Sequence, residues 1–64
     1  MKETTYTNRI NNDKIIVIHN GSLVEEVWVE TESDRRRNQA GSRINFQSFI
    51  NLLNYWTDFN LLAK

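Results

Sequence analysis

The sequence predicts an α+β fold in which a C-terminal helix packs against a small antiparallel sheet of two to three strands. Three observations predict it: β-branched runs flank Asn20-Gly21, an alternating segment surrounds Ile44, and apolar residues recur at helical spacing in the last third. The chain has 64 residues, of which 39% are apolar, so we expect one domain spanning 1–64. At this size a hydrophobic core is marginal, and oligomerisation or a partner is the usual additional source of stability.

The N-terminal residues 1–12 are polar and alternate weakly. Their Thr and Tyr content fits an edge strand, and a flexible arm fits equally well. They contain no apolar stretch of the kind that signal peptides have, and no run approaches the ~18 apolar residues of a membrane span. We therefore expect a cytoplasmic protein with no membrane partner.

The hairpin is the strongest local signal in the chain. Two runs rich in Ile and Val, at 14–19 and 22–31, flank Asn20-Gly21. Asn and Gly tolerate the positive φ angles of a two-residue type I′ turn better than other residues do. The sequence therefore predicts two antiparallel strands joined by this turn.

A two-residue loop at Asn20-Gly21 would pair His19 with Ser22 and Val17 with Val24. Side chains alternate between the two faces of a strand, so both faces become partly apolar. One face would carry Ile16, Ile18, Leu23, Val27 and Val29, and the other Ile15, Val17, His19, Val24, Glu26, Trp28 and Glu30. Because a small sheet usually has one solvated face, the second apolar face predicts contact with a partner or with a layer formed by the chain's own termini.

The segment from Ser33 to Ser42 has the polar, Gly-containing composition of a loop. It is followed by Arg43-Ile44-Asn45-Phe46, in which the alternation predicts a short third strand.

A helix is predicted from Phe46 or Gln47 to Leu62, with Asn45 or Ser48 as its N-cap. Its packing stripe would consist of Phe49, Leu52, Leu53, Trp56, Phe59 and Ala63. Its outer surface has apolar flanks and one charge, Asp58, so we expect that surface to be incompletely solvated.

No catalytic or metal-binding pattern is present. His19 is the sole histidine, the chain has no Cys, and Gly21 and Gly41 are isolated. A catalytic histidine would need a nucleophile or metal cluster beside it, and a phosphate loop would need clustered glycines. We therefore expect no enzyme and no cofactor, with His19 an exposed residue beside the turn.

The charges are balanced in number but not along the chain. Eight Lys and Arg residues match eight Asp and Glu residues, and a carboxylate-rich stretch at 25–34 precedes Arg35, Arg36, Arg37 and Arg43. Guanidinium groups on a loop fit phosphate contacts, so a small homodimeric nucleic-acid-binding protein is one hypothesis. Pairing with the neighbouring carboxylates is the favoured interpretation, because a neutral chain lacks the usual basic surface.

The first hypothesis is a non-enzymatic protein-binding module. A chain this small with surplus apolar surface is expected to use it for a partner or for a homodimer. The candidate contacts lie on the second sheet face (Glu26, Trp28 and Glu30) and on or after the helix (Ile50, Tyr55, Leu61 and Leu62). The alternative for Trp28 is that the faces are inverted and this side chain belongs to the core.

Asn20-Gly21-Ser22 closing a hairpin, with Phe46-Gln47-Ser48 opening a helix that carries Leu52 and Trp56, resembles the layout of small phage-encoded inhibitors. The resemblance is to small anti-CRISPR proteins of the type I-F class and covers about residues 14–56 as spacing. It implies a non-enzymatic protein that binds a large host nucleoprotein complex in the host cytoplasm through charged and aromatic surface residues. The density of arginine in 33–42 departs from that layout.

Overall fold

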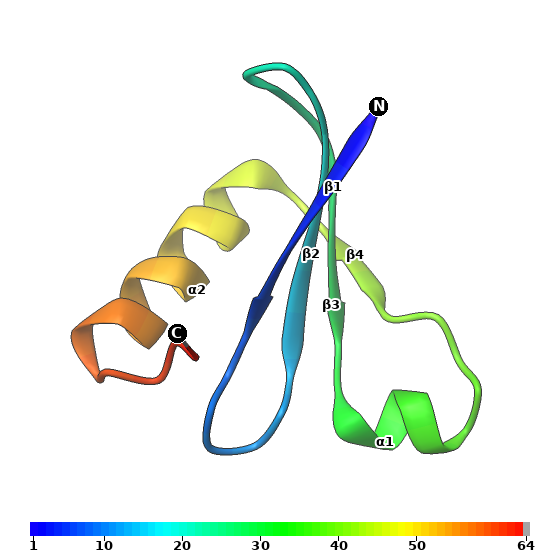
Figure 1. Ribbon diagram of the computed structural model, residues 1–64, viewed down its shortest axis with the longest axis vertical. Coiled ribbons are helices and arrows are strands. Elements are labelled where there is room, and N and C mark those ends of the chain that lie inside the picture. Colours follow the sequence, from blue (N-terminus) through cyan, green and yellow to red (C-terminus); the bar gives the residue numbers. More distant parts are fainter. Residues whose placement is uncertain (64) are drawn as a thin grey trace.

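The computed structural model describes residues 1–63 and has an α+β fold: a four-stranded antiparallel sheet with one long and one short helix (Figure 1). The elements are β1 (Lys2–Thr7), β2 (Lys14–Asn20), β3 (Leu23–Glu30), α1 (Glu32–Arg36), β4 (Ser42–Ile44) and α2 (Phe46–Asp58). Within residues 1–63 no helix is long and apolar enough to cross a membrane.

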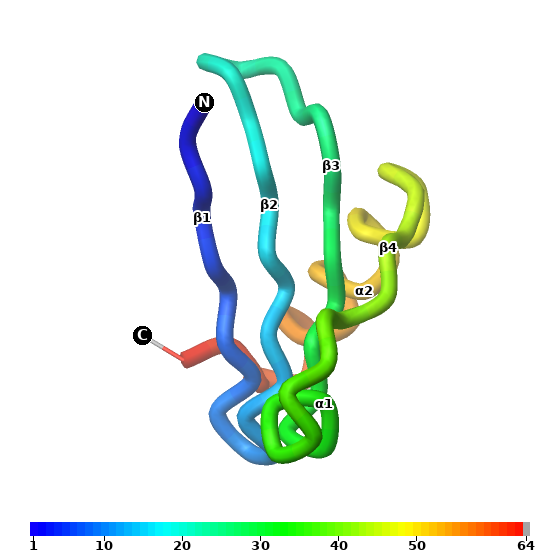
Figure 2. The backbone as a smooth tube through the Cα atoms, turned by 90° about the vertical axis from the view of Figure 1, so that its right-hand side faces the viewer, coloured from blue at the N-terminus to red at the C-terminus, as the bar shows by residue number. Residues whose placement is uncertain are grey.

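The strands lie side by side in chain order, β1-β2-β3-β4 (Figure 2). The prediction of two to three strands was therefore too low. The N-terminal residues form the edge strand β1, which was one of the two expected outcomes, and β4 is the short strand expected around Ile44. α2 covers one face of the sheet, and α1 lies at one end of the sheet on the other side (Figure 1).

The core lies between the sheet and α2. Its buried members come from β2, β3 and α2: Ile15, Val17, Val27, Phe49 and Trp56. The helical spacing thus identified Phe49 and Trp56 correctly, and Leu52 and Leu53 pack against the same cluster. Phe59 was also expected in this stripe, but it follows the last turn of α2 and is 64% exposed.

The hairpin turn differs from its prediction by one position. Asn20 pairs with Leu23, so the two-residue loop is Gly21-Ser22. Gly21 has φ of 61° and neither neighbour has a positive φ, which is the pattern of a turn with Gly at its first central position. The pairing of His19 with Ser22 was therefore wrong, and His19 pairs with Val24.

A β-bulge then shifts the register again between Ile18 and His19. His19 pairs with Val24 and Ile18 pairs with Glu26, which leaves Glu25 as the extra residue. One inserted residue exchanges the two faces of a strand relative to its partner. The predicted grouping of Ile16 and Ile18 with the Val27 face was wrong for this reason.

An asparagine flanks α2 at each end. The Asn45 side chain accepts a hydrogen bond from the Ser48 amide at 2.7 Å, which makes it the N-cap. At the other end, Asn60 has φ of 56°, the Leu61 amide donates to the Trp56 carbonyl, and the Asn60 amide donates to the Thr57 carbonyl. This is a Schellman motif, so the helix stops at Asp58 and not at Leu62 as expected.

The expected loop at 33–42 contains the short helix α1. Thr31 is its N-cap and forms a capping box with Asp34. It ends in the same manner as α2: Asn38 has φ of 54°, and the Gln39 amide donates to the Asp34 carbonyl at 2.9 Å. The remaining residues before β4 form the predicted irregular connection.

The segment after α2 returns to the edge of β1. Asn8 and Leu62 form an antiparallel bridge, with the Arg9 amide donating to the Leu61 carbonyl and the Ala63 amide to the Thr7 carbonyl. Asn8 is the one buried polar residue among those described, and its Oδ1 accepts from the amides of Ile10 and Asn11. This asparagine therefore shapes the β1–β2 turn and anchors the C-terminal segment.

Candidate functional site: the open sheet face

The sheet face opposite α2 is the candidate site, and we call it the open face. Cross-strand neighbours share a face, and because Ile15, Val17 and Val27 point to α2, the alternate residues point away from it. The register arranges them in three rows across the sheet. The rows are Glu3, Ile18 and Glu26 at the hairpin end, Thr5, Ile16, Trp28 and Arg43 in the middle, and Thr7, Lys14 and Glu30 at the turn end.

The centre of the open face is apolar. Ile16, Ile18 and Trp28 are partly buried. α2 lies on the other face of the sheet, and α1 lies at the turn end (Figures 1 and 2). Trp28 was expected on the second face together with Glu26 and Glu30, and the structure brings these three side chains together there. The companions differ from the prediction, because Ile16 and Ile18 replace Ile15 and Val17.

The hairpin end of the open face is acidic. Glu3 and Glu26 lie on either side of Ile18 in the same row. Glu26 forms an ion pair with Arg43 at 3.6 Å, in which the Arg43 side chain is 60% exposed and the Glu26 side chain 37% exposed. Such a pair contributes little to stability, so both groups can exchange partners at low cost.

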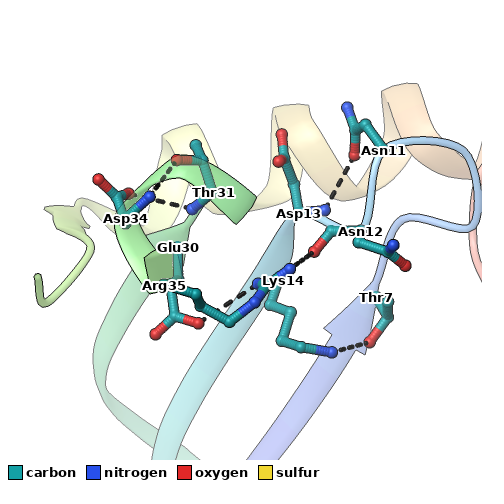
Figure 3. A network of polar contacts seen from close by, with 9 residues as sticks. All are labelled: Thr7, Asn11, Asn12, Asp13, Lys14, Glu30, Thr31, Asp34 and Arg35. Atoms are coloured by element: carbon teal, nitrogen blue, oxygen red, sulfur yellow. Dashed lines mark hydrogen bonds and ion pairs between the residues drawn. The ribbon is translucent and has the colours of Figure 1, made fainter. Parts of the chain in front are cut away.

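The turn end carries a polar network that includes α1 (Figure 3). Arg35 donates to the Glu30 carboxylate at 3.3 Å and to the Asn12 carbonyl at 2.7 Å. Lys14 Nζ donates to the Thr7 hydroxyl at 3.1 Å. Arg35 thus compensates Glu30 and ties α1 to the β1–β2 turn, whereas Lys14 makes no ion pair within residues 1–63.

α1 is fixed by its own capping network. The Thr31 amide donates to the Asp34 carboxylate at 3.0 Å, and the Asp34 amide donates to the Thr31 hydroxyl at 3.2 Å. Hydrogen bonds with the backbone and then the side chain of Thr31 lower the pKa of Asp34 below its ordinary value of 3.8. Desolvation opposes them, and the charge of Arg37 adds a smaller lowering of the pKa. The carboxylate is therefore held in its charged form.

The arginines predicted as an alternative nucleic-acid contact are mostly paired. Arg35 forms an ion pair with Glu30, Arg36 with Glu32 at 3.1 Å, and Arg43 with Glu26. Arg37 lies next to Asp34 at the end of α1. This arrangement agrees with the interpretation that the arginines pair with neighbouring carboxylates.

The helix-side candidates do not form one exposed surface. Ile50, Leu61 and Leu62 are partly buried against the core, and Leu61 and Leu62 lie beyond the end of α2. Tyr55 is 53% exposed and stacks on Phe59 with 4.8 Å between ring centroids. Of this set, Tyr55 alone is strongly exposed.

His19 lies on the α2 side of the sheet beside the turn. Its Nδ1 donates to the Gly21 carbonyl at 3.0 Å, because a carbonyl can only accept, and its Nε2 is 2.8 Å from the Thr4 hydroxyl. Both ring nitrogens are thus engaged in holding the end of the hairpin. Within residues 1–63 no cluster of three or more His, Asp and Glu side chains could hold a metal ion.

A hollow of about 430 Å³ adjoins the open face at its β4 edge. It lies where β4 leaves β3 and turns into α2, so its walls combine the bulge segment of β3 with the β4–α2 junction. The lining residues are Val24, Glu25, Glu26, Val27, Arg43, Ile44, Asn45 and Phe46. Sequence reasoning missed this hollow, because it depends on the early departure of β4.

No protein-family model matches the chain, and neither a curated protein nor a solved structure was found to be similar to it.

Proposed function

We propose that this protein is a non-enzymatic protein-binding module that contacts its partner through the open face. The observation that supports the proposal is the apolar centre formed by Ile16, Ile18 and Trp28 on the sheet face that points away from α2. A tryptophan flanked by aliphatic side chains and a charged rim is typical of protein interfaces. The solvated face of an antiparallel sheet more commonly alternates polar side chains at such positions.

We infer the class of the partner from the resemblance of this chain to small phage-encoded inhibitors. Under this proposal the partner is a host protein that processes nucleic acid or acts in defence, and the module blocks it by occupying a surface. The exposed Glu3 and the partly exposed Glu26 beside the apolar centre would face basic groups on that partner. The pairing of Arg35, Arg36 and Arg43 with carboxylates favours this proposal over nucleic-acid binding.

Site-specific photo-crosslinking in producing cells tests the proposal. A benzophenone amino acid replaces Thr5, which is exposed in the middle row of the open face, and the matched control replaces Asn51, which is exposed on α2. We expect protein adducts from position 5 that are absent from position 51, and their identification by mass spectrometry gives the partner. Equal adducts from both positions, or none from position 5, would contradict the proposal.

A further inference from the structure

We propose that Asn20 is a site of spontaneous covalent modification, at which the side chain cyclises onto the Gly21 amide at a rate that the hairpin controls. Nine asparagines occur in the chain, and Asn20 is the one that glycine follows. The reaction uses the chain itself and water, so it needs no partner and is independent of the proposed function.

The chemistry is the deamidation of an asparagine by the next backbone nitrogen. The Gly21 nitrogen loses its proton and forms a bond to Cγ of Asn20, while the bond from Cγ to the side-chain nitrogen breaks and ammonia leaves. The product is a five-membered succinimide ring. Water then opens the ring at one of its two carbonyl groups and gives either aspartate or isoaspartate, in which the backbone runs through the former side chain.

The tip of the hairpin supplies both reacting groups in an accessible form. Asn20 and Gly21 are exposed, and neither the Asn20 side chain nor the Gly21 amide is hydrogen-bonded within residues 1–63. Glycine has no Cβ to hinder the approach of its nitrogen, and nothing lies within 4 Å of the place where a Cβ of Gly21 would be. The two groups are therefore limited by backbone geometry and not by burial.

The backbone of the closed hairpin holds the two groups apart. Asn20 is the last residue of β2 and pairs with Leu23, so its backbone is extended. Ring closure needs the Gly21 nitrogen on the same side as Cβ of Asn20, and the ψ angle of an extended residue turns that nitrogen away. The ring can therefore form only when the Asn20–Leu23 pair opens.

Few contacts keep this end of the hairpin closed. Leu23 is 65% exposed, and the bulge leaves Glu25 without a partner on β2. His19 supplies the side-chain contacts, with Nδ1 bonded to the Gly21 carbonyl and Nε2 lying 2.8 Å from the Thr4 hydroxyl. Ends of elements with few buried contacts open at low free energy, so we expect this pair to open far more often than the core strands do.

The modification changes both charge and shape at the hairpin end. Alternation along β2 places Asn20 on the same side as Ile18, which is the side of the open face. Either product adds a carboxylate to the end of that face which already carries Glu3 and Glu26. Isoaspartate also lengthens the backbone by one methylene group, which is incompatible with the two-residue loop that joins β2 to β3.

Mass spectrometry of the full chain, incubated at mildly alkaline pH in buffer or in guanidinium chloride, tests the site. Proteolytic peptides are fragmented to locate each conversion and to distinguish aspartate from isoaspartate. The internal controls are Asn51 and Asn54, which are exposed on α2 and precede Leu52 and Tyr55. We expect Asn20 to convert first in both solvents, and at least about tenfold more slowly in buffer, which corresponds to an opening free energy of about 1.4 kcal/mol.

A pair of threonine variants tests the control by the hairpin. Thr4→Val removes the hydroxyl beside His19 and should speed conversion of Asn20 in buffer about twofold or more, as expected for the loss of one hydrogen bond. Thr5→Val makes the same change on the other face of β1 and should not. Circular dichroism verifies that both variants are folded.

Two sets of results would overturn the inference. If Asn20 stays intact in guanidinium chloride, or if Asn51 or Asn54 converts ahead of it, Asn20 is not the site. If the rates in buffer and in guanidinium chloride are equal, or if the two threonine variants behave alike, the hairpin does not control the reaction.

Discussion

Ile15 and Ile16 are adjacent and chemically identical, yet the structure places them on opposite faces of β2. Ile15 is fully buried beneath α2, and Ile16 lies on the open face. Replacing each by alanine therefore makes the same chemical change in two environments. A two-residue loop at Asn20-Gly21 would put Ile16 on the same sheet face as Val27 and Val29. The bulge moves Ile16 to the opposite face, so the comparison of the two variants also tests the bulge.

The expected costs follow from burial. Ile15→Ala removes three carbon groups at ~0.8 kcal/mol each, which gives about 2.5 kcal/mol before the cavity is counted, and measured changes of this type cost about 2–5 kcal/mol. Ile16→Ala loses lateral contacts and strand preference, a cost of about 1 kcal/mol. A domain of this length is expected to have about 3–10 kcal/mol of total stability. Ile15→Ala should therefore bring the chain close to unfolding.

Urea unfolding measures both variants and is followed by circular dichroism and by tryptophan fluorescence, to which Trp28 and the buried Trp56 both contribute. Protein concentration is kept near 1 μM so that self-association does not contribute to the free energy of unfolding. Thermal melts should give the same order, with Ile15→Ala lowering Tm by roughly 10–20 °C more than Ile16→Ala. Equal losses, or a larger loss for Ile16→Ala, would refute the assignment of faces.

Three further predictions concern the two glycines and the cap of α1. Gly41→Ala should strongly destabilise the pairing of β4 with β3, because an added Cβ would clash with the Val29 carbonyl group; thermal melts measure the loss. Gly21→Ala has open space for its Cβ but a φ of 61°, so it should cost about 1 kcal/mol in urea unfolding, less than Gly41→Ala. Hydrogen bonds from Thr31 lower the pKa of Asp34. The contribution of this carboxylate to the stability of the fold is therefore fully present above pH 3.8 and is lost as the pH falls through the lowered pKa. Between pH 2 and 6 the wild-type chain should therefore lose stability more steeply than Asp34→Asn, and parallel curves would contradict this.

The elements that local chemistry specifies were predictable from the sequence. The β-branched runs gave β2 and β3, and the helical spacing gave α2 with Phe49 and Trp56 in the core. The short helix α1 was missed, although Thr31 followed three positions later by Asp34 is a capping-box signal. Each helix is followed, two residues after its last one, by an asparagine with positive φ, and asparagine is a weaker stop signal than glycine.

The register of the hairpin could not be predicted, because two local signals competed. The Asn20-Gly21 pair favours a turn in which these two residues form the loop. In the structure the loop is Gly21-Ser22, and Glu25 is left without a partner on β2. The position of such a bulge depends on which side chains of β2 and β3 pack into the core against α2. The local sequence of the hairpin does not contain that information. The candidate site was nevertheless identified in part, since Glu26, Trp28 and Glu30 fall on the same side of β3 in any register.

The bridge between Asn8 and Leu62 has a consequence for the order of folding. Arg9 and Asn60 are hydrogen-bonded although they lie 51 positions apart, so closing this contact from an open chain would cost about 2 kcal/mol more than closing a six-residue turn. Residues 61–63 lose less conformational entropy on reaching β1 once α2 has packed on the sheet and the turn at Asn60 has formed. We expect this bridge to form last and open first, with the Arg9 and Ala63 amides exchanging hydrogen faster than those of β2. While it is open, the backbone edge at Thr7 and Arg9 is free to pair with another strand.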